Sequence, residues 1–221
     1  MRDLTEPGVV ELRRYTVPGG RETLIELFEA ELLVPQEDVG MLVMGQFRDV
    51  HDPDAFVWFR GFADMVTRRR GLEAFYGGPV WARHRDAANA TMVDSDDVLL
   101  LRPLGRVATD GAASRPGRLL IATWTLIELP EDRVLARWAA GNAERLAAVG
   151  GALHASLATE PSVNDFPRLP VRDGAHAVTV SRHDAELADP ALDPPGELED
   201  LVTGPPSLTW LAPTERSAWR A

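Results

Sequence analysis

The sequence contains no cysteine and no lysine, so its 23 basic residues are all arginine. Without cysteine the chain forms no disulfide, offers no thiolate to a metal and has no cysteine nucleophile. Without lysine it has no Schiff base and no lysine general base. No run approaches the ~18 apolar residues of a membrane span, and the first residues lack the apolar stretch of a signal peptide. We therefore expect a cytoplasmic protein with no membrane partner.

The net charge and the missing motifs argue against several further classes of protein. A net charge of −11 repels nucleic-acid phosphates, so the arginines at 68–70 are expected to form a solvated helix face. Phosphate-binding glycine loops and the G-x-S-x-G hydrolase motif are absent. The histidines show no metal-ligand spacing. We expect no nucleic-acid partner, no bound metal and no cofactor.

The first half of the chain alternates between strand and helix patterns. Its apolar residues predict strands at 9–17, 41–50, 56–62 and 96–104, with helices at 24–32, 62–76 and 80–92. The order is β-α-β-β-α-β, as in a ferredoxin-like unit. Residues 105–117 are rich in Gly, Ala, Ser and Pro and are expected to be a linker. The first domain is therefore placed at residues 1–104.

The second half repeats this order and is interpreted as a diverged tandem copy at residues 118–221. Strands are predicted at 118–129, 152–160, 175–183 and 206–213, a helix at 130–150 and a proline-interrupted helix at 184–202. Strands in both halves are apolar on both faces, which requires cover on both sides of each sheet. We therefore expect an α+β protein in which two ferredoxin-like βαββαβ units pack sheet against sheet as a pseudo-twofold barrel within one chain.

Five segments of the first half resemble the NIPSNAP family of dimeric α+β barrel proteins. They are ELRRYTVPG (11–19), GQFRD (45–49), FVWFRGFADM (56–65), FYGGPVWARHRDAANATM (75–92) and DSDDVLLLRP (94–103). The resemblance covers roughly residues 8–104 and implies the same barrel, but it implies no single activity. Relatives by fold include cofactor-free monooxygenases, lactone isomerases and haem peroxidases. The second half lacks the WFRGF and FYGGPVW segments and resembles a degenerate copy.

Strand alternation places Glu11, Arg13 and Tyr15 on one face of the first strand, and Trp58 and Arg60 on one face of the third. The two strands are neighbours in a ferredoxin-like sheet, so these side chains converge. If they face the barrel interior, the arginines can stabilise negative charge, Tyr15 can donate a hydrogen bond, and Glu11 is the candidate base. The alternative is a structural ion-pair network beneath the helices.

Three functions remain open from the sequence. The leading hypothesis is a small-molecule-binding barrel, as a cofactor-independent oxygenase or isomerase acting on an enolisable or aromatic substrate. Its catalytic candidates are Glu11, Arg13, Tyr15 and Arg60. Its binding candidates are Phe56, Trp58 and Gln46. The second hypothesis is a non-catalytic assembly or partner-binding module. The third is a haem protein with His84 as the candidate ligand.

Two expectations concern symmetry and assembly. The second half has lost the equivalents of Glu11 and Trp58, so any pocket is expected to belong chiefly to the first half, with one ligand per chain. The chain is expected to be either a monomer with an internal pseudo-dimer or a homodimer.

Overall fold

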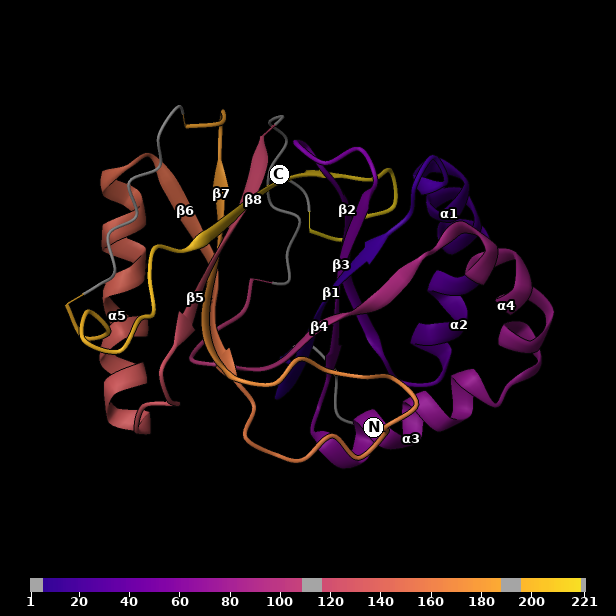
Figure 1. Cartoon of the computed structure of the whole chain (residues 1–221), viewed down its shortest axis with the longest axis horizontal. Coiled ribbons are helices and arrows are strands. Elements are labelled where there is room, and N and C mark those ends of the chain that lie inside the picture. Colours follow the sequence, from indigo (N-terminus) through magenta and orange to yellow (C-terminus); the bar gives the residue numbers. More distant parts are fainter. Residues whose placement is uncertain (1–5, 109–116, 188–195, 220–221) are drawn as a thin grey trace.

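The computed structural model describes residues 6–108, 117–187 and 196–219 (Figure 1). The first half contains β1 (Val9–Thr16), α1 (Arg21–Leu27), the π-helical segment η1 (Phe28–Leu32), α2 (Leu33–Asp38), β2 (Leu42–Asp49), β3 (Ala55–Phe62), α3 (Met65–Tyr76), α4 (Pro79–Thr91) and β4 (Asp94–Pro103). The second half contains β5 (Arg118–Leu126), α5 (Asp132–Ala148), β6 (Gly151–Thr159), β7 (Ala175–His183) and β8 (Ser207–Pro213).

The strands form a closed barrel in the order β1-β3-β2-β8-β5-β7-β6-β4. Read in one direction around the barrel, β4-β1-β3-β2 is followed by β8-β5-β7-β6, so both halves have the strand order of a ferredoxin-like unit in the same sense. The halves meet at two short antiparallel seams, between 47–49 and 211–213 and between 101–103 and 157–159. The predicted pseudo-twofold α+β barrel within one chain is confirmed.

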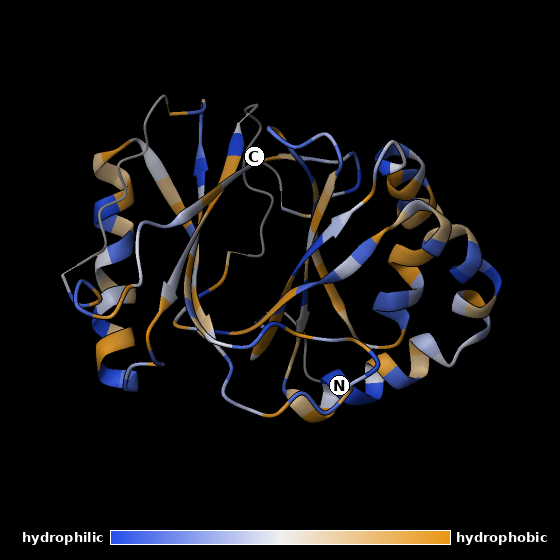
Figure 2. Cartoon of the chain, in the orientation of Figure 1, coloured by the Kyte–Doolittle hydropathy of each residue, from blue (hydrophilic) through white to orange (hydrophobic). Residues whose placement is uncertain are grey.

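The barrel interior is filled by apolar side chains from both halves. Alternate residues of the strands point inward, and the hydropathy colouring shows these strands as largely hydrophobic (Figure 2). The indole of Trp219 packs against Phe59 with ring centroids 4.9 Å apart, and its backbone N–H donates to the carbonyl of Met44. The interior residues are Val10, Leu12, Val57, Phe59, Leu99, Leu101, Leu119, Ile121, Ala155, Leu157, Val178, Val180 and Leu211, among others.

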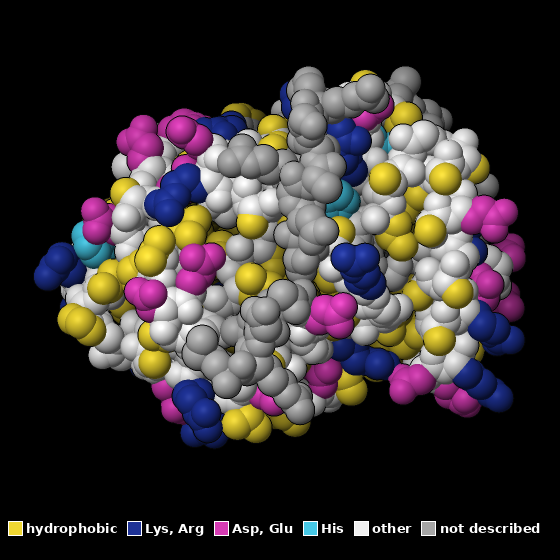
Figure 3. Space-filling view, turned by 180° about the vertical axis from the view of Figure 1, so that it is seen from behind, with side chains coloured by type: hydrophobic (Ala, Val, Ile, Leu, Met, Phe, Trp, Pro, Cys, Tyr) yellow, Lys and Arg dark blue, Asp and Glu magenta, His cyan; other side chains and the backbone are white. Residues whose placement is uncertain are grey.

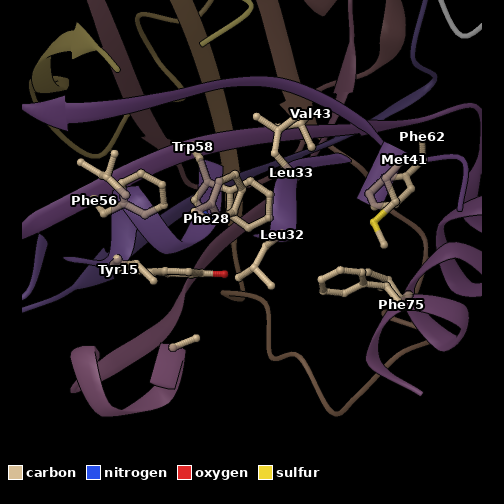
Figure 4. Close-up of a cluster of buried hydrophobic side chains, with 14 of the residues drawn as sticks. Tyr15, Phe28, Leu32, Leu33, Met41, Val43, Phe56, Trp58, Phe62 and Phe75 are labelled. Atoms are coloured by element: carbon tan, nitrogen blue, oxygen red, sulfur yellow. The ribbon is translucent and has the colours of Figure 1, made fainter. Parts of the chain in front are cut away.

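Helices cover the outer face of each sheet. Helices α1 to α4 lie against the first sheet and α5 lies against the second, on opposite sides of the barrel (Figure 1). A hydrophobic cluster that includes Phe28, Phe56 and Trp58 fills the space between the first sheet and its helices (Figure 4). No helix in the described ranges is long and apolar enough to cross a lipid bilayer.

Two predicted elements differ from the structure. The helix expected at 24–32 is instead the succession α1, η1 and α2, which continues to Asp38. The proline-interrupted helix expected at 184–202 is not formed in its described parts, 184–187 and 196–202; its remainder, with the prolines, lies outside the described residues. The predicted linker falls between β4 and β5, and its residues 109–116 also lie outside the described part of the chain.

Candidate functional site

The predicted site residues of β1 and β3 come together, but on the outer face of the sheet and not inside the barrel. Antiparallel pairing places Glu11 opposite Arg60 and Arg13 opposite Trp58. The intervening residues of both strands, such as Leu12, fill the barrel interior instead. The catalytic hypothesis depended on these side chains facing the barrel interior, and that condition is not met. Both faces of these strands are apolar enough to be buried, so alternation alone did not say which face is inside.

Glu11 is the centre of a buried ion cluster beneath the helices. Its Oε2 lies 2.7 Å from Nη1 of Arg13 and 2.6 Å from Nη2 of Arg60, and its Oε1 lies 2.7 Å from Nε of Arg68. Burial alone would raise the pKa of this carboxyl, but the guanidiniums of Arg60, Arg13 and Arg68 outweigh burial and hold the pKa far below 4.5. The arrangement is the ion-pair network beneath the helices that the sequence analysis gave as the alternative to a catalytic site.

Arg68 corrects the expectation of a solvated arginine run. Its side chain is fully buried, and its Nη1 lies 3.0 Å from Oδ1 of Asp165 and 3.1 Å from Oδ1 of Asn164. The sequence does indicate that Arg68 is buried, because it precedes the buried Leu72 and Phe75 by four and seven residues on one face of α3. Asp165 comes from the connection between β6 and β7, which runs beside α3 (Figure 1).

The cluster carries an excess of positive charge. Three guanidiniums, of Arg13, Arg60 and Arg68, face two carboxylates, of Glu11 and Asp165. In addition, Nη2 of Arg68 is buried and has no hydrogen-bond partner among the described residues. A buried charge is costly without a partner, so this region favours a nearby negative charge or a strong hydrogen-bond acceptor.

A small cavity of about 40 Å³ adjoins this cluster between the sheet and the helices. Tyr15 and Trp58 line it, whereas Glu11, Arg13 and Arg60 lie behind them and do not. The guanidinium carbon of Arg60 lies 5.0 Å from the centroid of the Trp58 ring. The other lining residues are Leu24, Phe28, Leu32, Gln36, Phe75, Tyr76, Trp81, Ala88 and Met92.

Tyr15 and Trp58 both have a donor that a molecule in this cavity can use. Nε of Arg13 donates to the Tyr15 oxygen at 2.8 Å, so the phenolic proton remains free to donate elsewhere. Burial raises the pKa of Tyr15 although Arg13 opposes it, which keeps the phenol protonated at neutral pH. In Figure 4 the Tyr15 hydroxyl points toward Leu32, into the cluster. Nε1 of Trp58 is buried and has no partner among the described residues.

Other predicted residues lie outside the cavity lining. Phe56 packs edge-on against Phe28, with ring centroids 5.5 Å apart. Gln46 donates to Glu29 at 3.3 Å. His84 pairs with Glu31, its Nε2 lying 3.5 Å from a carboxylate oxygen. Among the described residues, no group of three or more His, Asp or Glu side chains could hold a metal ion.

Sequence reasoning missed several residues that line the cavity, among them Phe28, Gln36, Tyr76 and Trp81. The helical stripe of Trp81, Ala88 and Met92 is visible in the sequence, and it is this stripe that faces the cavity. The contribution of Gln36 depends on the turn of α2 after the π-helical segment, which local spacing did not predict. π-Helical turns inside helices are frequent at functional sites.

A larger pocket of about 240 Å³ opens at one end of the barrel and draws on both halves. Five of its lining residues come from β1, β3 and β4, and the other eight come from β5, β8, the segment before β8 and the β6–β7 connection. The expectation that any pocket belongs chiefly to the first half is therefore met by the helix-side cavity and is wrong for this one.

Comparison with known proteins identifies the class of fold. No family model and no curated protein sequence matches the chain. Among solved structures, an anthrone oxidase-like protein is 16% identical, with a TM-score of 0.60, over 96% of this chain and 94% of that one. A candidate monooxygenase from Lactobacillus acidophilus NCFM is 11% identical, with a TM-score of 0.57, over 98% of this chain and 99% of that one. The chain thus shares the α+β barrel fold of these structures.

The resemblance to NIPSNAP proteins also appears among solved structures, over less than half of the chain. An uncharacterised NIPSNAP domain protein from Burkholderia xenovorans is 18% identical, with a TM-score of 0.39, over 43% of this chain and 93% of that one.

Proposed function

We propose that the chain binds a flat, enolisable or aromatic small molecule in the helix-side cavity and stabilises negative charge on one of its oxygens. Tyr15 donates a hydrogen bond to that oxygen, and Trp58 contacts the ring system. The observation that carries the proposal is the pairing of an aromatic cavity with a buried cluster of excess positive charge directly behind it.

The roles of the charged residues follow from their places. Arg13 polarises the phenol of Tyr15 through its 2.8 Å hydrogen bond, and Arg60 lies over the Trp58 ring. Both therefore act on a bound molecule through the side chains that line the cavity, and their fixed charges favour an enolate or phenolate over the neutral form. Glu11 holds these guanidiniums in place. Its depressed pKa makes it a weak base, so we assign it positioning instead of proton removal.

A flat ligand requires the cavity to open. Pockets for drug-sized ligands are ~300–1,000 Å³, against about 40 Å³ here. Helix α4 is the element best suited to move, because Ala88 is its one fully buried residue. Gly77 and Gly78 precede it, and Trp81 at its start lines the cavity. We propose that α4 moves outward to admit the ligand.

Anthrone is the probe that tests this proposal, because it is a tricyclic aromatic ketone that enolises readily and because an anthrone oxidase-like protein has a similar fold. Binding is followed by tryptophan fluorescence. Turnover is followed by oxygen uptake, since anthrone and O₂ give anthraquinone and water. We expect one saturable site per chain, weakened by Tyr15→Phe and by Trp58→Phe.

The second half provides the matched control. Trp124 is also buried, and its Nε1 also lacks a partner among the described residues, but it packs under α5 against Trp138 and lines neither cavity. Trp124→Phe should leave anthrone binding unchanged. If Trp124→Phe weakens binding as much as Trp58→Phe, or if anthrone does not bind, the proposal fails.

The non-catalytic module stays a second proposal, favoured by the small size of the cavity and by the completeness of the Glu11 ion pairs. It gains support if anthrone does not bind and the variants only lose stability. The residues present do not fit a haem. His84 does not line the cavity and faces Glu31, and a macrocycle needs far more space than is available.

A further inference from the structure

The cavity described above that draws on both halves lies on the other face of the first sheet, at the mouth of the barrel. Leu12 and Val57 contribute to it, whereas their neighbours Arg13 and Trp58 point to the opposite, helix-covered face. The sheet therefore separates it from the proposed site. We call this cavity, of about 240 Å³, the mouth pocket. Its lining residues are Leu12, Arg14, Val57, Asp97, Leu99, Ile121, Thr123, Thr125, Arg172, Thr203, Pro205, Ser207 and Thr209.

The floor of the mouth pocket is apolar and its wall carries hydroxyl groups. Leu12, Val57, Leu99 and Ile121 are buried residues of the barrel core that close its inner end. Above them the second half supplies the hydroxyls of Thr123, Thr125, Ser207 and Thr209, which make no side-chain hydrogen bond within the described part of the chain. A ring of uncommitted donors and acceptors over an apolar floor suits a molecule with an apolar body and one polar end.

The charged groups at the rim are already paired with one another. Arg14 donates to Asp49 and to Asp52, each at 2.6 Å, and Arg172 donates to Asp97 at 3.1 Å. Each of these carboxylates is bound to a guanidinium and both guanidiniums are bound to carboxylates, so the rim leaves no unpaired charge for a cation or for an anion. Figure 3 shows acidic, basic and hydrophobic side chains interspersed over one face of the molecule. The rim therefore favours an uncharged ligand.

Volume limits the size of that ligand. A cavity of ~150 Å³ is enough to hold one benzene molecule, whereas drug-sized ligands need ~300 Å³ or more. The mouth pocket, at about 240 Å³, matches a single substituted ring or a short branched chain. We propose that the mouth pocket is a binding site for uncharged molecules of this size that carry a hydroxyl or carbonyl oxygen, distinct from the helix-side cavity.

Benzyl alcohol is the probe, because it combines one apolar ring with one uncharged hydroxyl group. Methyl-labelled protein is titrated with it and followed by nuclear magnetic resonance, which reports on both cavities at once. We expect saturable shifts in the methyl groups of Leu12, Leu99, Ile121 and Thr123. Benzoate, of similar size but anionic, should bind at least tenfold more weakly.

Variants locate the contact. Thr209→Val keeps the side-chain shape and removes the hydroxyl, and should weaken benzyl alcohol binding about threefold to tenfold. Thr23→Val, at an exposed position of α1, is the matched control and should have no effect. The methyl spectrum of each free variant shows whether it is folded.

Three results would overturn the proposal. They are an absence of saturable shifts, benzoate binding as tight as that of benzyl alcohol, and shifts confined to Leu24, Leu32 and Met92, which would place the ligand in the helix-side cavity. Failure of anthrone binding leaves this proposal untouched, because the two ligands report on different methyl groups.

Discussion

The outer faces of the two sheets have the same strand order and different chemistry. Beneath α1 to α4, β1 and β3 carry Glu11, Arg13 and Arg60 with aromatic neighbours. Beneath α5, the corresponding strands β5 and β7 present small or apolar side chains such as Ala122, Trp124 and Ala177, which pack with Trp138 of α5.

The comparison shows that the backbone arrangement does not create the site. A single helix with apolar and small partners covers the second sheet, and its buried polar groups include the neutral pair Asn142 and Ser156, joined by a 2.8 Å hydrogen bond from Asn142 to Ser156. The first sheet buries four charges close together and needs α3 and the β6–β7 connection to supply Arg68 and Asp165. The charges, and not the topology, distinguish the two faces.

The largest expected effect is on the carboxylate at the centre of the first face. Glu11→Gln leaves three buried guanidiniums without their shared anion and should lower the free energy of unfolding by ~3–5 kcal/mol. Urea denaturation measures the change. Glu22→Gln, which removes a partly exposed partner of Arg48, is the control and should change stability by less than ~0.5 kcal/mol. Equal losses of stability in the two variants would mean that the buried ion cluster stabilises the fold no more than an exposed ion pair does.

Arg60→Met should have the next largest effect. It keeps most of the side-chain volume but removes the hydrogen bonds of Arg60 to Glu11 and Gln36. Because Arg13 and Arg68 still neutralise Glu11, we expect a loss of about 2–3 kcal/mol, less than for Glu11→Gln. Thermal melting measures the loss of stability, and anthrone titration of the same variant measures the loss of ligand binding. Loss of binding with unchanged melting would assign Arg60 to the ligand alone.

The depressed pKa of Glu11 predicts a pH dependence confined to acid. Its folded-state pKa lies below the unfolded value near 4.5, so the stability it contributes is complete above that value and declines as pH falls toward the folded pKa. Roughly 2 kcal/mol should be lost from this group between pH 4.5 and pH 3. The free energy of unfolding of Glu11→Gln, measured by denaturation over the same pH range, should fall by about that much less than in the unmodified protein. A parallel decline in both proteins would contradict the assignment.

On the second face, the effects should be smaller because the buried Asn142 and Ser156 are neutral. Asn142→Ala removes the partner of the buried Ser156 hydroxyl and should cost about 1–2 kcal/mol. Adding Ser156→Ala should recover part of that loss, since the stranded hydroxyl is removed. A double-mutant cycle measures the coupling between them. A loss as large as that of Glu11→Gln would erase the difference between the faces.

The sequence predicted the barrel because its signals were local or compositional. Each strand is an apolar run between turn residues, and the repeated β-α-β-β-α-β order leaves few arrangements. The convergence of Glu11 with Arg60 and of Arg13 with Trp58 followed from strand adjacency and alternation. What alternation could not decide was the face, because Val9 and Tyr15 on the face of Glu11 are buried, as are Val10 and Leu12 on the other face.

The remaining parts of the site depend on contacts distant in sequence. Arg68 could have been placed from its helical spacing to Leu72, but its second partner, Asp165, is 97 residues away. Phe28 and Gln36 reach the cavity by way of a π-helical turn between two short helices, which no hydrophobic period marks. The mouth pocket exists only when β1 and β4 of one half meet β5 and β8 of the other.

The two seams of the barrel, each of three residue pairs, join halves that belong to one chain. In a barrel built from two separate chains, closure is a bimolecular equilibrium that dilution reverses. Here the covalent connection fixes the effective concentration of one half for the other, at the millimolar level typical of short tethers. Dilution therefore does not separate the two halves, and for a monomeric chain the melting temperature should be the same at nanomolar and micromolar protein. The connection also frees each half from matching the other, since no symmetry requires a substitution to appear twice.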